Sequence, residues 1–545
     1  MLSKPILLYS QTKEKIVITE KDIKEMKVHS VVDLLNQIPG VRATKNSVNI
    51  RGFGSKEVLV LLDGRPLNDP YSRNVNLEGI SINDIEKIVI EKGSGALKYG
   101  ANVTGGVILI FTKEVKKKTT AHMDVSYGRF NTLRGEFNLR CPLKIVDVLF
   151  SLNGTRTDGF RKNGWGRNFG TAIKLKRNKF TFSTQYATLD EGYPGRIYSP
   201  TPRARSKRDD LGIVFLATFD NLKSRSYFDY FYKSHKNPDI SLDKNMTCYV
   251  LGQSLQVTSP FNAGIDSSLN IVKGKDIKSH REGDFALYGS KDWSFLGINF
   301  GLGLRVDWHS EFGLTIDPQF KLSGRFLPIE FELFINRSHN YPTFYQRFYE
   351  TTFMKGNPDL DMEKAWNYKL CLSSKINKLF QPSLTFFYSD IKDRITAIKG
   401  NDGIIRYKNL GSTSKKGIET TINSEIFSFL SFNVSYIYLI AKDERTGKLL
   451  PYQAKHQIQS NLYLKLTSDL TVTFHGYYVS RRFCKPEEKE PLSPYFVLDA
   501  KIAFKLKDWE AYIEIDNLLD RYYEPHDGYP APGITYTFGI MREFR

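Results

Sequence analysis

The first stretch with the residue types for chemistry is EKGSGALKYG, residues 91–100. Glycines that precede a helix can present backbone amides to a phosphate group. This stretch lacks the G-K-[ST] of a phosphate-binding loop and the G-x-G-x-x-G of a dinucleotide-binding turn. We therefore predict a structural turn here and no nucleotide site.

Histidine and cysteine give no better candidate for catalysis or for a built-in metal site. The nine histidines fall mostly singly, without an H-E-x-x-H pattern. The four cysteines lie more than 100 residues apart and make neither a zinc pattern nor a recognisable disulfide framework. No nucleophile and base can be paired from their spacing. We predict a protein that is not an enzyme and has neither a catalytic residue nor a resident cofactor.

The elements that would position any site are predominantly β-strands. Aromatic residues make up 13% of the 545 residues, which favours strands because rings pack well on pleated surfaces. No run of 18 apolar residues exists, so the sequence predicts no membrane-spanning helix. The mean hydropathy of -0.37 does not exclude a membrane barrel, in which only every second residue faces lipid.

Residues 16–115 have a mixed α and β pattern and form the first predicted domain, after a tether of residues 1–15. Thr19 with Asp22, and Ser30 with Asp33, fit the pattern of a capped helix start. Strands are expected near 47–51, 57–62, 85–90 and 107–112. The first 15 residues lack a signal-peptide core, so either a leader is missing from this sequence or the protein is not exported.

From residue 116 to 545 the pattern changes to long alternating strands. LGINFGLGLRVDW, residues 296–308, alternates strictly over more residues than a usual soluble strand contains. We count about 22 such segments, taking 385–397 and 404–422 as one long strand each. Short turns alternate with long loops, as in an outer-membrane barrel. A pair of soluble β-sandwiches is the alternative, and it requires shorter strands.

The positive charge belongs to this second region. Of the formal net charge of +19, the segment 116–545 carries +16. Such a surface fits nucleic acid, an anionic lipid or an anionic ligand, and scattered solubilising residues are the simpler alternative. No clustered basic helix or ribonucleoprotein-type motif points to nucleic acid.

Five ordered motifs in the first domain carry a family resemblance. They are DLLNQIPGV (33–41), VNIRGFGS (48–55), VLVLLDGRPLND (58–69), INDIEKIVIEKGSGALKYG (82–100) and GGVILIFTKE (105–114). Together they resemble the plug domain of TonB-dependent outer-membrane transporters, and the remainder resembles the barrel of that family. The resemblance implies a transmembrane barrel of about 22 antiparallel strands with a mixed α/β plug inside its lumen.

Membership of this family implies a monomeric receptor in the outer membrane of a Gram-negative-type bacterium. The expected partners are TonB with ExbB and ExbD, outer-membrane lipid and lipopolysaccharide, and the barrel assembly machinery, which would read Phe544. The expected ligand is a scarce metal chelate, a ferric siderophore or cobalamin, which brings its own iron or cobalt. The alternative is an uncoupled barrel that acts as a passive channel or an adhesin.

The same resemblance suggests roles for individual residues. The outward plug loop would offer Tyr71, Arg73 and Asn74 to the ligand, and external loops would close over it with Tyr193, Arg196, Tyr198 and Arg203. Arg51 and Lys92 would latch the plug to acids of the barrel wall, although Lys lacks the bidentate fork of Arg. A segment resembling a TonB box comprises Glu14, Lys15, Ile16, Val17, Ile18 and Thr19, which also fit a first plug strand. The cobalamin branch allows loop calcium, which the basic residues around Asp190, Glu191, Asp209 and Asp210 disfavour.

Overall fold

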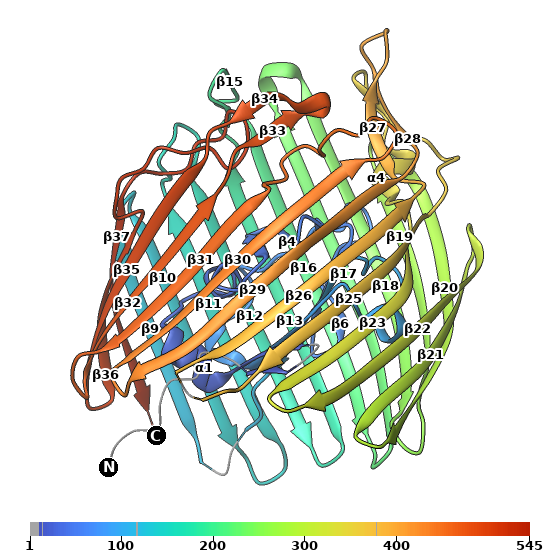
Figure 1. The fold of residues 1–545 in the computed structure, drawn as a ribbon. Coiled ribbons are helices and arrows are strands. Elements are labelled where there is room, and N and C mark those ends of the chain that lie inside the picture. The colour runs from blue at the N-terminus through green and yellow to red at the C-terminus, as the bar shows by residue number, and fades with distance from the viewer. Residues whose placement is uncertain (1–9, 13–14, 116–117, 378, 545) are drawn as a thin grey trace.

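The computed structural model describes residues 10–12, 15–115, 118–377 and 379–544. A small α/β plug lies within a large closed barrel, as Figure 1 shows. This arrangement confirms the predicted fold class. None of the helices in the described part of the chain is long and apolar enough to cross a membrane.

The plug is built on a six-stranded sheet in the order β1-β2-β7-β8-β5-β6, in which β5 and β8 run parallel. Its strands and helices are β1 (Ser10–Thr12), β2 (Lys15–Thr19), α1 (Glu20–Met26), α2 (Val31–Asn36), β3 (Val41–Thr44), β4 (Ser47–Ile50), β5 (Val58–Leu62), β6 (Arg65–Pro66), η1 (Ile82–Asp84), β7 (Ile85–Lys92), α3 (Ala96–Tyr99) and β8 (Gly106–Thr112). The four strands predicted by range match β4, β5, β7 and β8 to within two residues, and the two predicted helices match α1 and α2, whereas β1, β3, β6, η1 and α3 were not predicted.

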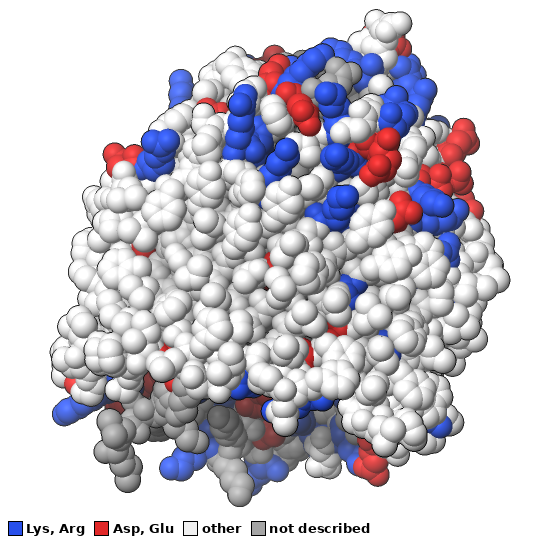
Figure 2. Space-filling model, viewed as in Figure 1, with Lys and Arg blue, Asp and Glu red and all other residues white. Residues whose placement is uncertain are grey.

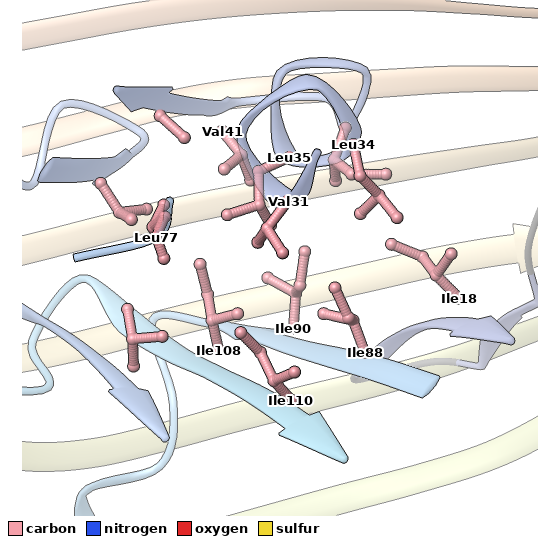
Figure 3. Packing of buried hydrophobic residues seen from close by; sticks show 14 of the residues in the cluster. Ile18, Val31, Leu34, Leu35, Val41, Leu77, Ile88, Ile90, Ile108 and Ile110 are labelled. Atoms are coloured by element: carbon pink, nitrogen blue, oxygen red, sulfur yellow. The ribbon is translucent and has the colours of Figure 1, made fainter. Parts of the chain in front are cut away.

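Local sequence signals fix the two predicted plug helices. Thr19 and Asp22 form a complete capping box at the start of α1, and the Ser30 side chain accepts a hydrogen bond from the Asp33 amide at the start of α2. Each cap satisfies amides that a helix start leaves unpaired. Figure 3 shows apolar side chains of α2 packed against those of β7 and β8, and these residues are buried in one cluster. The helix caps predicted from sequence are confirmed.

The barrel contains 22 antiparallel strands, each paired with its neighbours, and β37 closes on β9. The alternative of two β-sandwiches is therefore wrong. The strands are β9 (Thr120–Gly128), β10 (Thr132–Pro142), β11 (Asp147–Thr157), β12 (Gly166–Arg177), β13 (Phe180–Gly192), β16 (Arg205–Thr218), β17 (Leu222–Asn237), β18 (Leu242–Val257), β19 (Asn262–Gly274), β20 (Lys278–Phe295), β21 (Ile298–His309), β22 (Gly313–Phe326), β23 (Ile329–Asn340), β25 (Glu363–Ser374), β26 (Gln381–Lys392), β29 (Thr413–Phe427), β30 (Leu430–Asp443), β31 (His456–Lys465), β32 (Leu470–Val479), β35 (Tyr495–Leu506), β36 (Trp509–Asp516) and β37 (Thr535–Phe544).

The alternation seen in the sequence separates the two faces of the wall. In β21, Leu302, Leu304 and Trp308 are exposed on the outside, whereas Arg305 and Asp307 are buried against the plug. An apolar outside and a polar inside are what a barrel in lipid requires. Figure 2 shows a wide band almost free of charged residues, with Lys, Arg, Asp and Glu gathered at its upper edge.

Long connections leave one end of the barrel, which we call the outer end, and short turns join the strands at the inner end. The outer connections contain short elements of their own. These are β14 (Gly195–Arg196), β15 (Ser199–Pro200), η2 (Pro238–Ile240), α4 (Phe344–Phe348), β24 (Met354–Lys355), β27 (Ile395–Lys399), β28 (Ile405–Asn409), β33 (Arg482–Lys485), η3 (Pro486–Glu488) and β34 (Lys489–Leu492).

The prediction that 385–397 and 404–422 are single strands is wrong in detail. The first run is divided between β26 and β27, and the second between β28 and β29. Asp393 adopts a left-handed backbone with φ of 57° at the first break, and Gly411 does so at the second with φ of 60°. Beyond the breaks, β27 and β28 join β24 in a separate three-stranded sheet. The barrel strand count is unaffected because each run contributes one wall strand.

Candidate functional site

One barrel acid holds both predicted latch cations of the plug. Glu419 of β29 pairs with Arg51 at 2.8 Å and with Lys92 at 2.6 Å. Lys92 also donates a hydrogen bond to the Pro39 carbonyl at 2.6 Å. All three charged side chains are at most 7% exposed, so water screens their attraction little. The contact fixes the turn after β4 and the end of β7 to the same point on the wall.

A second anchor lies at Glu57, just before β5. Its carboxylate pairs with Arg394, at the break between β26 and β27, and approaches Lys415 of β29 at 3.7 Å. Burial opposes ionisation of Glu57, but Arg394 and Lys415 outweigh it and hold the pKa of Glu57 below its ordinary value. The base of the outer β27–β28 hairpin is thereby tied directly to the plug.

The loop after β5 provides two further anchors. Arg65 pairs with Asp229 of β17, and Asp69 pairs with Lys233 of the same strand at 2.6 Å. Sequence reasoning did not assign Glu57, Arg65 or Asp69 a role. All three lie in or beside the family-like motifs at 48–55 and 58–69, and this position was the sequence signal that could have identified them.

A cavity of about 440 Å³ lies between the plug loop and the barrel wall towards the outer end. Tyr71 and Asn74, two of the predicted ligand residues, line it. Tyr71 packs edge-on against Tyr345 of α4, with ring centres 5.5 Å apart. The other side chains that the site uses are Lys56, Lys233, His235, Lys244, Asp276 and Tyr349.

The lining combines aromatic rings with cations. The ammonium of Lys244 lies 4.1 Å from the centre of the Tyr349 ring. Burial raises the pKa of Tyr71, so its phenol stays protonated at neutral pH. Lys233 is already paired with Asp69, which leaves Lys56 and Lys244 as the cations available to a ligand. This arrangement can bind an anion that also presents a flat apolar surface.

Tyr193 is the predicted loop residue that contacts the wall of this cavity through His235, although it does not line the cavity itself. Its ring packs edge-on against His235 at 5.5 Å, and its hydroxyl is 2.9 Å from that of Tyr529. Burial and the hydrogen bond with Tyr529 raise the pKa of Tyr193 to about 12. Tyr193 therefore connects the 519–533 loop with the cavity wall as a neutral hydrogen-bonding group.

The remaining predicted loop residues are engaged with other loops. Arg196 donates a hydrogen bond to the Tyr198 hydroxyl at 2.8 Å, and Tyr198 in turn donates to Asp527. Arg203 pairs with Asp239 at 2.5 Å. In this structure these side chains hold the outer loops together. They do not line the cavity described above.

Arg73 lies deeper than the other plug-loop residues. It adopts a left-handed backbone with φ of 62° and lines a separate cavity of about 460 Å³ between the plug and the strands β17–β21. Burial lowers the pKa of its guanidinium, while acids including Asp284 and Asp69 oppose that shift. Its contact with the ligand remains a prediction.

The segment that resembles a TonB box is part of the plug sheet. Residues Lys15–Thr19 form β2, which pairs with β7 on one side and with β1 on the other. Ile16 and Ile18 are buried. Glu14 lies outside the described residues. An interaction of this segment with TonB would require it to leave the sheet.

Two groups of acids bear on metal binding. Each carboxylate considered for loop calcium is engaged by a cation: Asp190 by Arg205, Glu191 by Lys45, Asp209 by Lys207 and Asp210 by Arg208. In the barrel wall, Asp307, Asp317 and His339 place ligand atoms within 4.8 Å of one another. Asp307 pairs with Arg305, and Asp317 is hydrogen-bonded to His339 at 2.6 Å, so contacts within the protein account for that cluster.

Comparison with known proteins agrees with this architecture. The model of the TonB-dependent receptor plug domain matches residues 8–107, and the TonB-dependent receptor-like β-barrel model matches residues 123–518. A curated relative, the vitamin B12 transporter BtuB of Vibrio cholerae, is 23% identical over 97% of this chain and 92% of its own.

Solved structures share the fold at low sequence identity. The siderophore receptor PirA from Acinetobacter baumannii has a TM-score of 0.80 at 16% identity, covering 98% of this chain and 99% of its own. The copper transporter OprC has a TM-score of 0.83 at 14% identity, with the same coverage. Because the two domain models together span most of the chain, the protein belongs to the TonB-dependent receptor family and resides in the outer membrane of a Gram-negative bacterium.

Proposed function

We propose that this protein binds a large metal chelate at its outer end and imports it with energy delivered by TonB, ExbB and ExbD. The main support is the cavity lined by cations and aromatic rings, which lies directly above the plug. Buried ion pairs fix that plug inside the barrel. A docked plug obstructs the lumen, so passage of a large ligand requires work on the plug. The function is transport, and no catalytic step is needed for it.

The cavity favours an anionic aromatic chelate such as a ferric siderophore. Its lining contains Lys56 and Lys244 with one acid, Asp276, and Lys56 also lies near Glu363 and Glu57 beyond that lining. Ammonium groups bind carboxylate or catecholate oxygens, and the rings of Tyr71 and Tyr345 cover apolar ligand surface. The excess positive charge of the barrel would also steer an anion towards the cavity.

Cobalamin is the second candidate, and a different observation favours it. The similarity to a vitamin B12 transporter extends over 97% of this chain. A corrinoid would contact the cavity mainly through rings and hydrogen bonds, so salt would weaken its binding little.

Titration of the refolded protein in detergent separates these ligands. Intrinsic fluorescence is followed with cobalamin, cobinamide and a panel of ferric siderophores at two salt concentrations. Tight, salt-sensitive binding of an iron chelate supports the first candidate, and salt-insensitive binding of a corrinoid supports the second. Binding of neither class would refute the proposal.

Substitutions test whether this cavity is the site. Lys56→Gln and Lys244→Gln should each weaken binding of an anionic chelate about ten-fold, as expected for loss of a charged hydrogen bond. Arg203→Gln is the matched control, because Arg203 is paired with Asp239 away from the cavity. Equal losses in all three variants would contradict this placement of the ligand.

Energy coupling distinguishes the proposal from an uncoupled channel or adhesin. Uptake of labelled ligand by cells should cease when the proton gradient is collapsed. Uptake that continues would favour the uncoupled alternative. A deletion of residues 14–19 would not replace this experiment, because it would also remove β2 from the plug sheet.

We propose two further partners, which an outer-membrane location supports. Phe544 ends the last strand, β37, with its side chain exposed on the outside, and is the residue we propose for recognition by the barrel assembly machinery. Lipopolysaccharide is the other proposed partner.

A further inference from the structure

Four lysines lie at the outer ends of consecutive wall strands. Lys364 is near the start of β25, Lys392 ends β26, Lys416 is near the start of β29 and Lys442 is near the end of β30. These strands are successive neighbours in the barrel. We call the four residues the outer lysine row.

The row faces away from the lumen. Lys392, Lys416 and Lys442 each follow a buried residue, and successive side chains of a strand point to opposite faces. Lys364 and Lys392 are direct partners across the β25–β26 pair. In the view of Figure 1 these strands form the front wall, and Figure 2 shows Lys and Arg gathered at the top of that wall.

An aromatic belt lies on the same face, below the row. Trp366, Tyr368, Tyr388 and Tyr436 are 37 to 40% exposed, and the rings of Tyr368 and Tyr388 stack at 5.9 Å. Tyr388 is also the direct strand partner of Lys416. Aromatic belts mark the boundary between hydrocarbon and head groups in membrane barrels. The row therefore lies at the height of the lipid head groups.

The charge of the row is incompletely balanced within the chain. Lys364 has Asp393 at 3.9 Å, whereas the structure gives Lys392, Lys416 and Lys442 no side-chain partner among the residues it describes. The carboxylates nearby are Asp390, Asp393 and Glu444, and Glu444 accepts a hydrogen bond from Ser414. Like charges opposite each other on paired strands are destabilising, so an external anion would stabilise the row.

We propose that the outer lysine row binds the phosphate groups of a glycolipid in the outer leaflet of the outer membrane. Its lysines would contact the phosphates while the aromatic belt packs on the start of the acyl chains. The proposal specifies the site of the lipid partner proposed above. It depends on the outer-membrane location and not on which chelate is transported.

The test compares two triple variants with the wild type. Lys392→Gln, Lys416→Gln and Lys442→Gln together remove all of the row except Lys364. Lys144→Gln, Lys375→Gln and Lys507→Gln together are the control, since these exposed lysines lie in turns at the inner end. Each delipidated protein in detergent is titrated with diphosphoryl lipid A, with fully dephosphorylated lipid A and with inorganic phosphate.

The wild type and the control should bind diphosphoryl lipid A about 100-fold more tightly than the row variant, since each lysine at an anionic membrane surface contributes a factor of about five. Binding of dephosphorylated lipid A should be the same in all three proteins. An unaffected row variant would overturn the proposal, and so would inorganic phosphate that competes as well as the lipid. Retained β-sheet circular dichroism and retained chelate binding in the row variant show that its fold and transport site are intact.

Discussion

Glu419→Gln should release the plug from its main latch. The substitution keeps the shape of the side chain but leaves Arg51 and Lys92 buried without their shared counter-charge. Breaking a buried ion pair by removing one partner costs about 3–5 kcal/mol. Lys92 retains its hydrogen bond to the Pro39 carbonyl, which favours the lower end of that range. Because about 1.4 kcal/mol is a factor of ten, the undocked plug should become roughly 100- to 1,000-fold more populated.

Conductance across a planar lipid bilayer measures this change, since an undocked plug opens the lumen to ions. Asp390→Asn is the matched control, because it removes one carboxylate from the outward face of the adjacent strand β26. A double variant, Glu419→Gln with Lys92→Gln, should recover part of the loss by removing one stranded cation. Conductance of Glu419→Gln at the level of the control would refute the reasoning, since it would mean that the latch does not hold the plug.

Three further predictions concern the plug, and urea unfolding of the plug region tests each of them. The pKa of Glu57 is held below its ordinary value of 4.5, so its contribution to plug stability should be constant at neutral pH and be lost as the pH falls below about 4.5. The Glu57→Gln variant should lack this pH-dependent part of the stability. Identical pH profiles for the variant and the wild type would contradict the role given to Glu57. Ser30→Ala should lower plug stability by about 1 kcal/mol through loss of the α2 cap, whereas exposed Ser241→Ala in a barrel turn should have no effect on it. Gly106→Ala should cost at least about 2 kcal/mol, because φ is 134° and a Cβ there would lie 2.2 Å from the Glu91 carbonyl oxygen; a stable variant would show that β7 and β8 can separate at this point.

The sequence alone determined the elements whose signals are periodic or local. Strict alternation in β21 arises because one face of the barrel wall meets lipid and the other meets the polar interior. This periodic pattern predicts a barrel from the sequence alone. The caps at Thr19 and Ser30 involve residues three positions apart, so a short window contains the whole interaction. The plug motifs are also short local stretches, so they indicated the family from the sequence alone.

Tertiary structure alone decided which groups meet. Arg51 and Glu419 are 368 residues apart, and no spacing could show that one acid serves both latch cations. Arg203 is predicted to contact the ligand, and only the fold shows that Asp239 lies beside it. His235 and Lys244 are direct partners across the β17–β18 pair, and they became candidate site residues only because the plug loop lies against that part of the wall. Such contacts depend on the registers of many strands together, which no local stretch of sequence contains.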